Sequence, residues 1–282
     1  MHDFGLGLKP ITQAEHDWLD AVCVEFPASC CAVGEVPLSY HPPLTKKNQG
    51  RTNTCAGQAF STGRELLNYQ RTGTIEVYSA LAAYLFAKRR YDGTYNDDGT
   101  SISSLFAGGL EDGTPREESC PFNGRVDPRA LTQRAIDEAK QHRTGQFVRL
   151  RSYQDCFRFM TSNVGGFIEI GAPWYDGLTV QSLGTNRETC AGYTGRFLGF
   201  HARTLTGWFS PEEMSRYCRD FDAARPDLEI WNSHADGPRP ITADAVDMIC
   251  NDPRCEVIGC MDQTEFAPKA FADWSKTECL VA

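Results

Sequence analysis

The sequence predicts an α+β fold with two lobes, a helical N-terminal lobe followed by a β-rich C-terminal lobe. Apolar residues recur at helical spacing from Cys55 to about residue 145. Beyond that point, runs rich in aromatic and branched residues have the character of strands. No repeat, low-complexity tract or long linker interrupts the chain, so we expect the two lobes to meet along a cleft.

The helical half begins with a short helix and a loop. Helical spacing is found in ITQAEHDWLDAVCVEF (11–26), while VPLSYHPPLTKKNQG (36–50) is rich in proline, glycine and asparagine, which favour an extended loop. A longer helix is predicted to begin at Cys55 and to end near Gly73. Its buried face carries Ala59, Phe60, Leu66 and Leu67.

Two further helices and a set of strands follow. SALAAYLFAKRRYD predicts an amphipathic helix beginning at Ser79, and DDGTSISSLFAGGLEDG predicts one capped by Asp or Thr and ended by a glycine pair. Strands are expected in QFVRLRSY, GGFIEIGAPW, FLGFHARTLTGWF and DLEIWNSHADG, and a short helix in DCFRFMTSN.

Composition limits the class of protein. Apolar residues make up 41% of the 282 residues, enough for a substantial core. The net charge of −9 disfavours binding to nucleic acid or to anionic membranes. No apolar stretch is long enough for a membrane span, and the first residues lack the apolar core of a signal peptide. Localisation stays open, and a component of a virus or phage particle is compatible with these features.

Twelve cysteines are many for a chain without an export signal, and seven of them lie in the terminal segments. Cys250, Cys255, Cys260 and Cys279 are candidate ligands for zinc or an iron–sulfur cluster. Their spacing does not match a zinc knuckle, so disulfides that tie the tail to the core are the simpler interpretation, and we expect no cofactor.

Cys55 is the candidate nucleophile. It lies in NQGRTNTCAGQAF (48–60), where a loop rich in Gly and Asn meets the predicted helix. The free amides and dipole of a helix N-terminus stabilise a thiolate, which is the reactive form of cysteine. Gln49, six residues earlier, is placed to donate its amide, together with the backbone N–H of Cys55, to an oxyanion. A buried structural cysteine is the alternative.

His201 and Asn232 complete the constellation. His201 lies on a predicted strand, 146 residues after Cys55, and Asn232 ends the next strand, 31 residues later. Each residue alone has an ordinary structural explanation, a core histidine or a turn. The three residues together, in this order, are much less expected by chance than each one alone.

These motifs resemble those of the papain-like cysteine peptidases, whose helix-opening cysteine follows a Gln-Gly loop and precedes a distant His and Asn. The resemblance covers roughly residues 35–237 and includes SALAAYLFAK and the Cys-Pro-aromatic run after Ser119. It implies a papain-like two-lobe fold with a barrel-like second lobe. The corresponding boundaries are 1–34 for an N-terminal extension, 35–245 for the peptidase domain, and 246–282 for a Cys-rich tail. Within that domain the helical lobe spans about 50–145 and the β-rich lobe about 146–245.

The resemblance also implies roles. Cys55 attacks a carbonyl carbon, His201 transfers the proton, Asn232 orients His201, and Gln49 stabilises the oxyanion. A resting thiolate–imidazolium pair is implied as well. The glycines near Gly99, Gly108 and Gly109 are candidates for one wall of the substrate cleft.

Several positions depart from the family pattern. Ala56 replaces a tryptophan, Thr52 replaces a disulfide cysteine, and His234 replaces the tryptophan that shields the Asn–His hydrogen bond. Trp208 and Trp231 are candidate substitutes for that shield.

The expected function is hydrolysis of peptide bonds in a peptide or protein substrate. Two alternatives stay open: a phage or virion-associated enzyme acting on peptidoglycan stem peptides, and a non-catalytic relative used in binding or assembly with other subunits.

Overall fold

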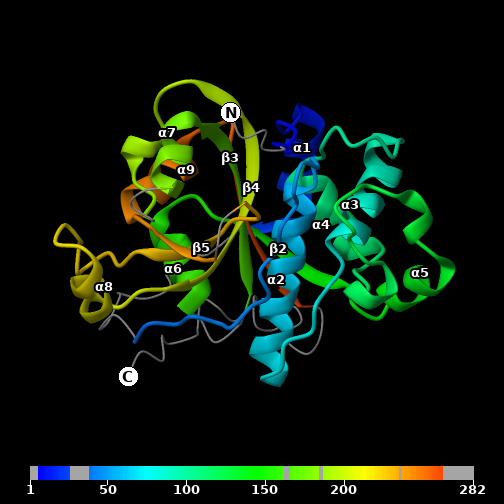
Figure 1. The fold of residues 1–282 in the computed structure, drawn as a ribbon, viewed down its shortest axis with the longest axis horizontal. Helices are drawn as coiled ribbons and strands as arrows, with labels where there is room; N and C mark the ends of the chain where they lie inside the picture. Colours follow the sequence, from blue (N-terminus) through cyan, green and yellow to red (C-terminus); the bar gives the residue numbers. More distant parts are fainter. Residues whose placement is uncertain (1–5, 26–37, 162–165, 184–186, 235–236, 263–282) are drawn as a thin grey trace.

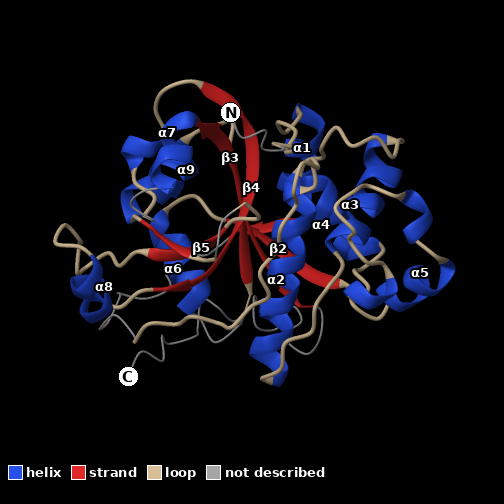
Figure 2. Ribbon diagram, in the orientation of Figure 1, coloured by secondary structure: helices blue, strands red, loops and turns tan. Residues whose placement is uncertain are grey.

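The computed structural model describes residues 6–25, 38–161, 166–183, 187–234 and 237–262. In this part of the chain, seven strands form one sheet with helices packed against it (Figure 1, Figure 2). Along the sheet the strands are β1 (Cys23–Glu25), β2 (Thr144–Arg149), β7 (Glu256–Asp262), β3 (Phe167–Tyr175), β4 (Phe197–Trp208), β5 (Leu228–Trp231) and β6 (Arg239–Ile241). Only the β1–β2 pair is parallel among these strands. The predicted α+β class is confirmed.

The helices lie in two groups on either side of α2, which stands in front of the sheet (Figure 1). The α-helices are α1 (Gln13–Val22), α2 (Cys55–Thr72), α3 (Ala80–Ala87), α4 (Ile102–Glu111), α5 (Gln133–Ala139), α6 (Tyr153–Thr161), α7 (Asp176–Leu183), α8 (Pro211–Tyr217) and α9 (Ala243–Asn251). A π-helical turn, Lys88–Asp92, extends α3, and 3₁₀ turns occur at Glu117–Ser119, Pro128–Ala130 and Cys190–Gly192. Helices α3 to α5 lie to one side of α2 and α6 to α9 to the other.

The sheet separates two hydrophobic cores because successive side chains of a strand point to opposite faces. Phe167 faces the core that contains α2 and α4, whereas its neighbour Ile168 faces the core that contains α6 and α9. Phe147 and Val148 divide in the same way on β2. One continuous sheet therefore joins the two halves of the chain, and the division into two lobes stays a prediction.

Helix α2 is central and almost entirely buried. Residues 55–68 are all buried, and they include the predicted face of Ala59, Phe60, Leu66 and Leu67. The helix ends as predicted at Gly73, whose φ of 71° is the left-handed conformation that glycine adopts without strain. Thr204 on β4 donates a hydrogen bond to the Ala59 carbonyl (2.7 Å), which fixes the helix against the strand that carries His201.

Helix α4 differs from the prediction at both ends. Its cap is Ser101, whose side chain accepts from the Ser104 amide, and the helix continues through the glycine pair to Glu111. Gly109 serves packing here, since a Cβ at this position would lie 2.4 Å from Cζ of Phe60 on α2. The glycines thus permit a close approach of two helices and do not end one.

Part of the predicted tail belongs to the sheet. Residues 246–251 lie in α9, and β7 runs between β2 and β3 in the middle of the sheet. Cys260 on β7 is buried against the α2 core, whereas Cys250 and Cys255 pack against the other core. The domain boundaries themselves stay predictions, and Cys279 lies outside the described residues.

Among the described residues, no helix combines the length and apolarity that crossing a membrane requires.

Candidate active site

Cys55 is the first residue of α2, directly after the N-cap residue Thr54. Its side chain is fully buried. The backbone N–H groups of Ala202, Gly7 and Ala56 face its sulfur. Ala202 follows His201 in β4, so the strand that carries the histidine lies against the helix end that carries the cysteine. The predicted helix-opening position of Cys55 is found.

His201 and Asn232 lie side by side. Nε2 of His201 is 2.9 Å from Oδ1 of Asn232, and both side chains are buried. The same oxygen accepts the backbone N–H of His234 (3.0 Å), which fixes the orientation of the amide. Because Oδ1 only accepts, Nε2 must donate, and Nδ1 is left as the basic nitrogen of the neutral ring. Nδ1 has no hydrogen-bond partner among the described residues.

Two aromatic rings hold the His201 imidazole. The Trp174 ring meets it edge-on at a centroid distance of 5.0 Å, and the His234 ring stacks on it at 5.1 Å with 19° between the planes. Trp208 packs on Tyr40 and Phe157, and the indole N–H of Trp231 binds Glu229. The sequence-based choice of Trp208 or Trp231 as the shield is therefore wrong. β3 supplies a tryptophan that meets the imidazole edge-on, and His234 itself stacks on the ring.

Gln49 lies buried in the loop that leads to Cys55. Its amide nitrogen donates to the carbonyl of Thr52 (2.7 Å), and its side-chain oxygen accepts from the hydroxyl of Ser233, the residue after Asn232. The loop before the cysteine is thus bonded to the loop after the asparagine. This contact brings Gln49 into the same site as Asn232.

An extended N-terminal segment covers Cys55. Residues 6–9, which we call the strap, run between the start of β4 and residues 99–100. Leu8 donates its N–H to Phe200 (3.3 Å), while Thr100 accepts from Lys9 (3.0 Å) and donates to Gly7 (2.9 Å). Gly7 is so close to the loop beneath that a Cβ would lie 2.0 Å from the carbonyl oxygen of Asn53. The strap directs the backbone N–H of Gly7 toward the Cys55 sulfur. The group that faces the sulfur is thus a hydrogen-bond donor and not a carbonyl carbon that the thiol could attack.

Burial keeps both reactive groups neutral. Burial raises the pKa of the Cys55 thiol to about 11, although the three amides around the sulfur act in the opposite direction. Burial also lowers the pKa of His201 well below its usual range, the His234 charge adds to this effect, and the bond to Asn232 opposes it. The covered site therefore holds a thiol and a neutral imidazole, in place of the expected ion pair.

Comparison with known proteins identifies the fold that carries this arrangement. No family model and no curated protein matches the sequence. Among solved structures, xylellain, a cysteine protease from Xylella fastidiosa, matches with a TM-score of 0.67 and 16% identity over 92% of this chain and 97% of that chain. Procathepsin B S9 from Trypanosoma congolense matches with a TM-score of 0.57 and 15% identity over 90% of each chain.

The chain has a papain-like fold. Procathepsin L 3 from the larval midgut of Tenebrio molitor supports the same conclusion, with a TM-score of 0.58 and 11% identity over 89% of this chain and 82% of that chain. The fold-level resemblance expected from the sequence is confirmed, and at these identities the likeness is one of fold alone.

Three of the four cysteines suggested as metal ligands lie in the described part of this papain-like fold, and they do not share one face of the sheet. Cys260 lies on one face of the sheet, and Cys250 and Cys255 pack on the other. No group of three or more potential ligands occurs among the described residues. None of the nine described cysteines forms a disulfide with another of them, so the expected disulfides do not occur within this part of the chain. Cys30, Cys31 and Cys279 lie outside the described residues.

Three neighbours of the site were not found by sequence reasoning. Gly7 gave no signal, because a glycine near a chain end has no pattern that indicates a distant contact. Trp174 was assigned to a strand, but its contact with His201 was not predicted. The two residues are 27 positions apart and become neighbours only through the pairing of β3 with β4. Ser233 had a signal, since it follows Asn232 directly.

Proposed function

We propose that this protein is a cysteine peptidase that hydrolyses peptide bonds with Cys55 as nucleophile and His201 as base. The observation that supports this most strongly is the buried His201–Asn232 hydrogen bond, which leaves Nδ1 of His201 as an unpartnered base beside the helix end that carries Cys55. The papain-like fold around these residues supports the same chemistry by analogy, because xylellain, which shares the fold, is a cysteine protease.

In the proposed reaction, Nδ1 of His201 takes the Cys55 proton, and the sulfur attacks the scissile carbonyl carbon. The backbone N–H of Cys55 and the Gln49 amide stabilise the oxyanion of the tetrahedral intermediate. His201 then protonates the leaving amine, which departs from a thioester on Cys55. Water, deprotonated by His201, attacks the thioester and releases the acid. Asn232 keeps the imidazole in the required orientation throughout.

The strap has to leave before substrate enters, because it occupies the approach to Cys55 and desolvates the site. Its removal re-exposes the thiol to water, which favours the ionised form. Two structural neighbours are named as procathepsins, and a precursor form is consistent with a covered site in this chain.

The test uses a variant that expels the strap. A methyl group at position 7 would lie 2.0 Å from the Asn53 oxygen, so Gly7→Ala must displace the segment. We expect Gly7→Ala to hydrolyse casein and to react with iodoacetamide at Cys55 at least about tenfold faster than the wild type. Adding Cys55→Ala abolishes hydrolysis without changing the melting temperature.

The matched control is Cys260→Ala in the Gly7→Ala background, since Cys260 is an equally buried thiol of the same core. It should leave hydrolysis intact. Selective alkylation of Cys55 without hydrolysis of any peptide would favour a non-catalytic relative. Equal labelling of Cys55 and the other thiols would contradict an activated nucleophile.

A further inference from the structure

Two side chains of the strap, those of Leu8 and Lys9, occupy formed sites on the molecule. Leu8 is 6% exposed and belongs to the core around α2. Gly171 on β3 leaves the space for it, since a Cβ there would lie 2.8 Å from Cδ2 of Leu8 and 2.7 Å from Cδ1 of Ile102. The Leu8 seat is therefore an apolar pocket between β3 and α4.

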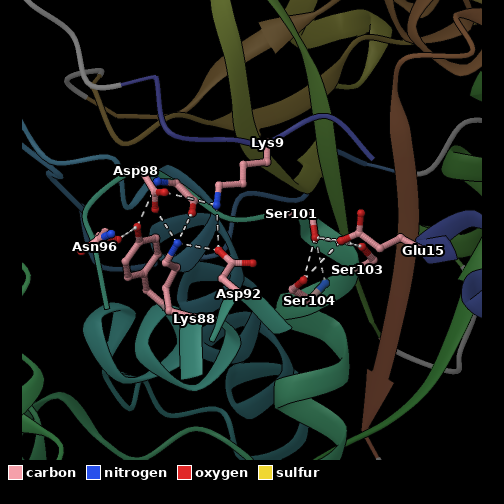
Figure 3. Close-up of polar contacts among 11 residues, drawn as sticks. Lys9, Glu15, Lys88, Asp92, Asn96, Asp98, Ser101, Ser103 and Ser104 are labelled. Atoms are coloured by element: carbon pink, nitrogen blue, oxygen red, sulfur yellow. Dashed lines mark hydrogen bonds and ion pairs between the residues drawn. The ribbon is translucent and has the colours of Figure 1, made fainter. Parts of the chain in front are cut away.

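Lys9 is seated in an acidic site. Its Nζ lies 3.0 Å from Asp92 and 3.5 Å from Asp98, which we call the acid pair. Figure 3 shows Lys9 reaching down to this pair from the strap. Asp98 is about half exposed and Asp92 is mostly covered, so the site opens to solvent on one side.

Beneath the acid pair lies a second lysine. Lys88, fully buried, contacts Asp92 (2.5 Å) and Asp98 and donates to the carbonyl of Gly99 (3.1 Å) (Figure 3). Its single charge compensates one of the two carboxylates, and Lys9 compensates the other. When the strap leaves, the acid pair retains one negative charge that no cation of this cluster balances.

The backbone beside the Leu8 and Lys9 sites offers hydrogen-bonding groups to an extended chain. Phe200 on one side and Thr100 on the other provide the carbonyls and the N–H that bind the strap. An extended substrate would use the same groups by adding a strand between them. Phe200 directly precedes His201, so the seats lie beside the reactive residues.

We infer that the strap occupies two substrate subsites: an apolar pocket that selects an aliphatic side chain, and the acid pair, which selects a lysine or arginine side chain next to it. This inference rests on the proposed function in so far as it treats the bound peptide as a substrate. The preference for binding such a peptide does not require catalysis. Peptides that place an aliphatic residue beside a basic one are the class that fits.

The first experiment opens the strap by charge. In the full-length Lys9→Glu variant a third carboxylate faces the acid pair, and repulsion should raise the rate of Cys55 alkylation about tenfold over the wild type. Two peptides are then added as competitors, acetyl-LGLKP-amide, which copies residues 6–10, and acetyl-LGLEP-amide. We expect the lysine peptide to protect Cys55 at a concentration about tenfold lower than the glutamate peptide.

A matched pair of variants locates the preference. Asp98→Asn in the Lys9→Glu background should make the two peptides equally protective. Asp137→Asn, which removes a carboxylate that is paired with Lys140 on the surface, should leave the difference unchanged. If Lys9→Glu unfolds the protein, the same peptides are compared in Gly7→Ala, which opens the strap by steric contact.

The outcomes separate this inference from the proposed function. Equal protection by the two peptides, or a preference that survives Asp98→Asn, would overturn the acidic subsite even if the protein cleaves peptides. Preferential protection by the lysine peptide in a protein that cleaves nothing would sustain the subsite and reject the peptidase. A lysine preference that weakens as salt rises from 50 to 500 mM agrees with a partly exposed charge pair, whereas an unchanged preference contradicts it.

Discussion

His201 has an unusual neighbour in His234, which stacks on it where the papain-like pattern has tryptophan. A ring at this position shields the Asn232 hydrogen bond from water in either case. A histidine differs because it gains a positive charge as the pH falls. That charge lies close to the imidazolium that the proposed mechanism needs, and it lowers the pKa of His201.

His234→Phe keeps the ring and removes the charge. Because a histidine is charged only when protonated, the variant and its parent should react alike at high pH and diverge as the pH falls. We expect the alkylation of Cys55 in a Gly7→Ala background to persist to lower pH in the Phe variant. Rates measured from pH 4.5 to 8.5 check this, and superimposable profiles would show that the His234 charge does not reach the reactive pair.

At the scale of elements, the approach of α4 to α2 depends on one glycine of a pair. A Cβ on Gly109 would lie 2.4 Å from Cζ of Phe60, while a Cβ on Gly108 would lie 3.6 Å from its nearest neighbours on α3, an ordinary contact. The two glycines thus differ in role, although the sequence presents them as equivalent.

This difference predicts opposite effects on stability. Gly108→Ala should raise the free energy of unfolding by about 0.5–1 kcal/mol, because alanine favours the helix. Gly109→Ala should lower it by about 1–3 kcal/mol, because the added methyl overpacks the contact with Phe60. Urea denaturation of both variants measures the two values. Stabilisation by both substitutions would mean that α4 can move away from α2 at little cost.

Local sequence patterns were sufficient to predict most helices and strands. They did not predict the contacts between segments that are distant in the sequence. The helix start at Cys55 and its end at Gly73 follow from capping and from the left-handed conformation of glycine, which are local effects. The strand that carries His201 and the strand that ends just before Asn232 follow from their content of aromatic and branched residues. The central place of β7 and the cover over Cys55 depend on pairing between residues more than 80 positions apart, for which one sequence holds no signal.

At the scale of the whole molecule, two buried carboxylates lie between the sheet and the helices on its α2 side. Glu169 on β3 is fully buried, and neither of its side-chain oxygens has a hydrogen-bond partner among the described residues. Glu256 on β7 faces the N-terminus of α4, where the N–H groups of Ile102 and Ser103 bind it. Burial raises the pKa of both groups, and for Glu256 it reaches about 8.

These shifts make global stability depend on pH in a defined direction. The pKa of Glu256 is about 8 in the folded protein, against an ordinary value of 4.5, so folding favours the protonated acid. Its favourable contribution is complete below about pH 4.5 and is lost as the pH rises to about 8, by on the order of 1 kcal/mol per pH unit. Ionised Glu256 also repels Glu15, which binds Ser101, Ser103 and Ser104 at the start of α4 (Figure 3).

Glu256→Gln should therefore flatten the decline in the free energy of unfolding between pH 4.5 and 8, since an amide keeps the hydrogen bonds and cannot ionise. Glu169 keeps its own raised pKa in this variant, so a smaller slope should persist and should fall further in the Glu169→Gln, Glu256→Gln double variant. Glu118→Gln, at an exposed site, is the matched control and should leave the slope unchanged. Urea melts at half-unit pH steps measure the slopes. A slope in Glu256→Gln equal to that of the wild type would mean that water reaches this carboxylate and that its burial does not set the pH response of the fold.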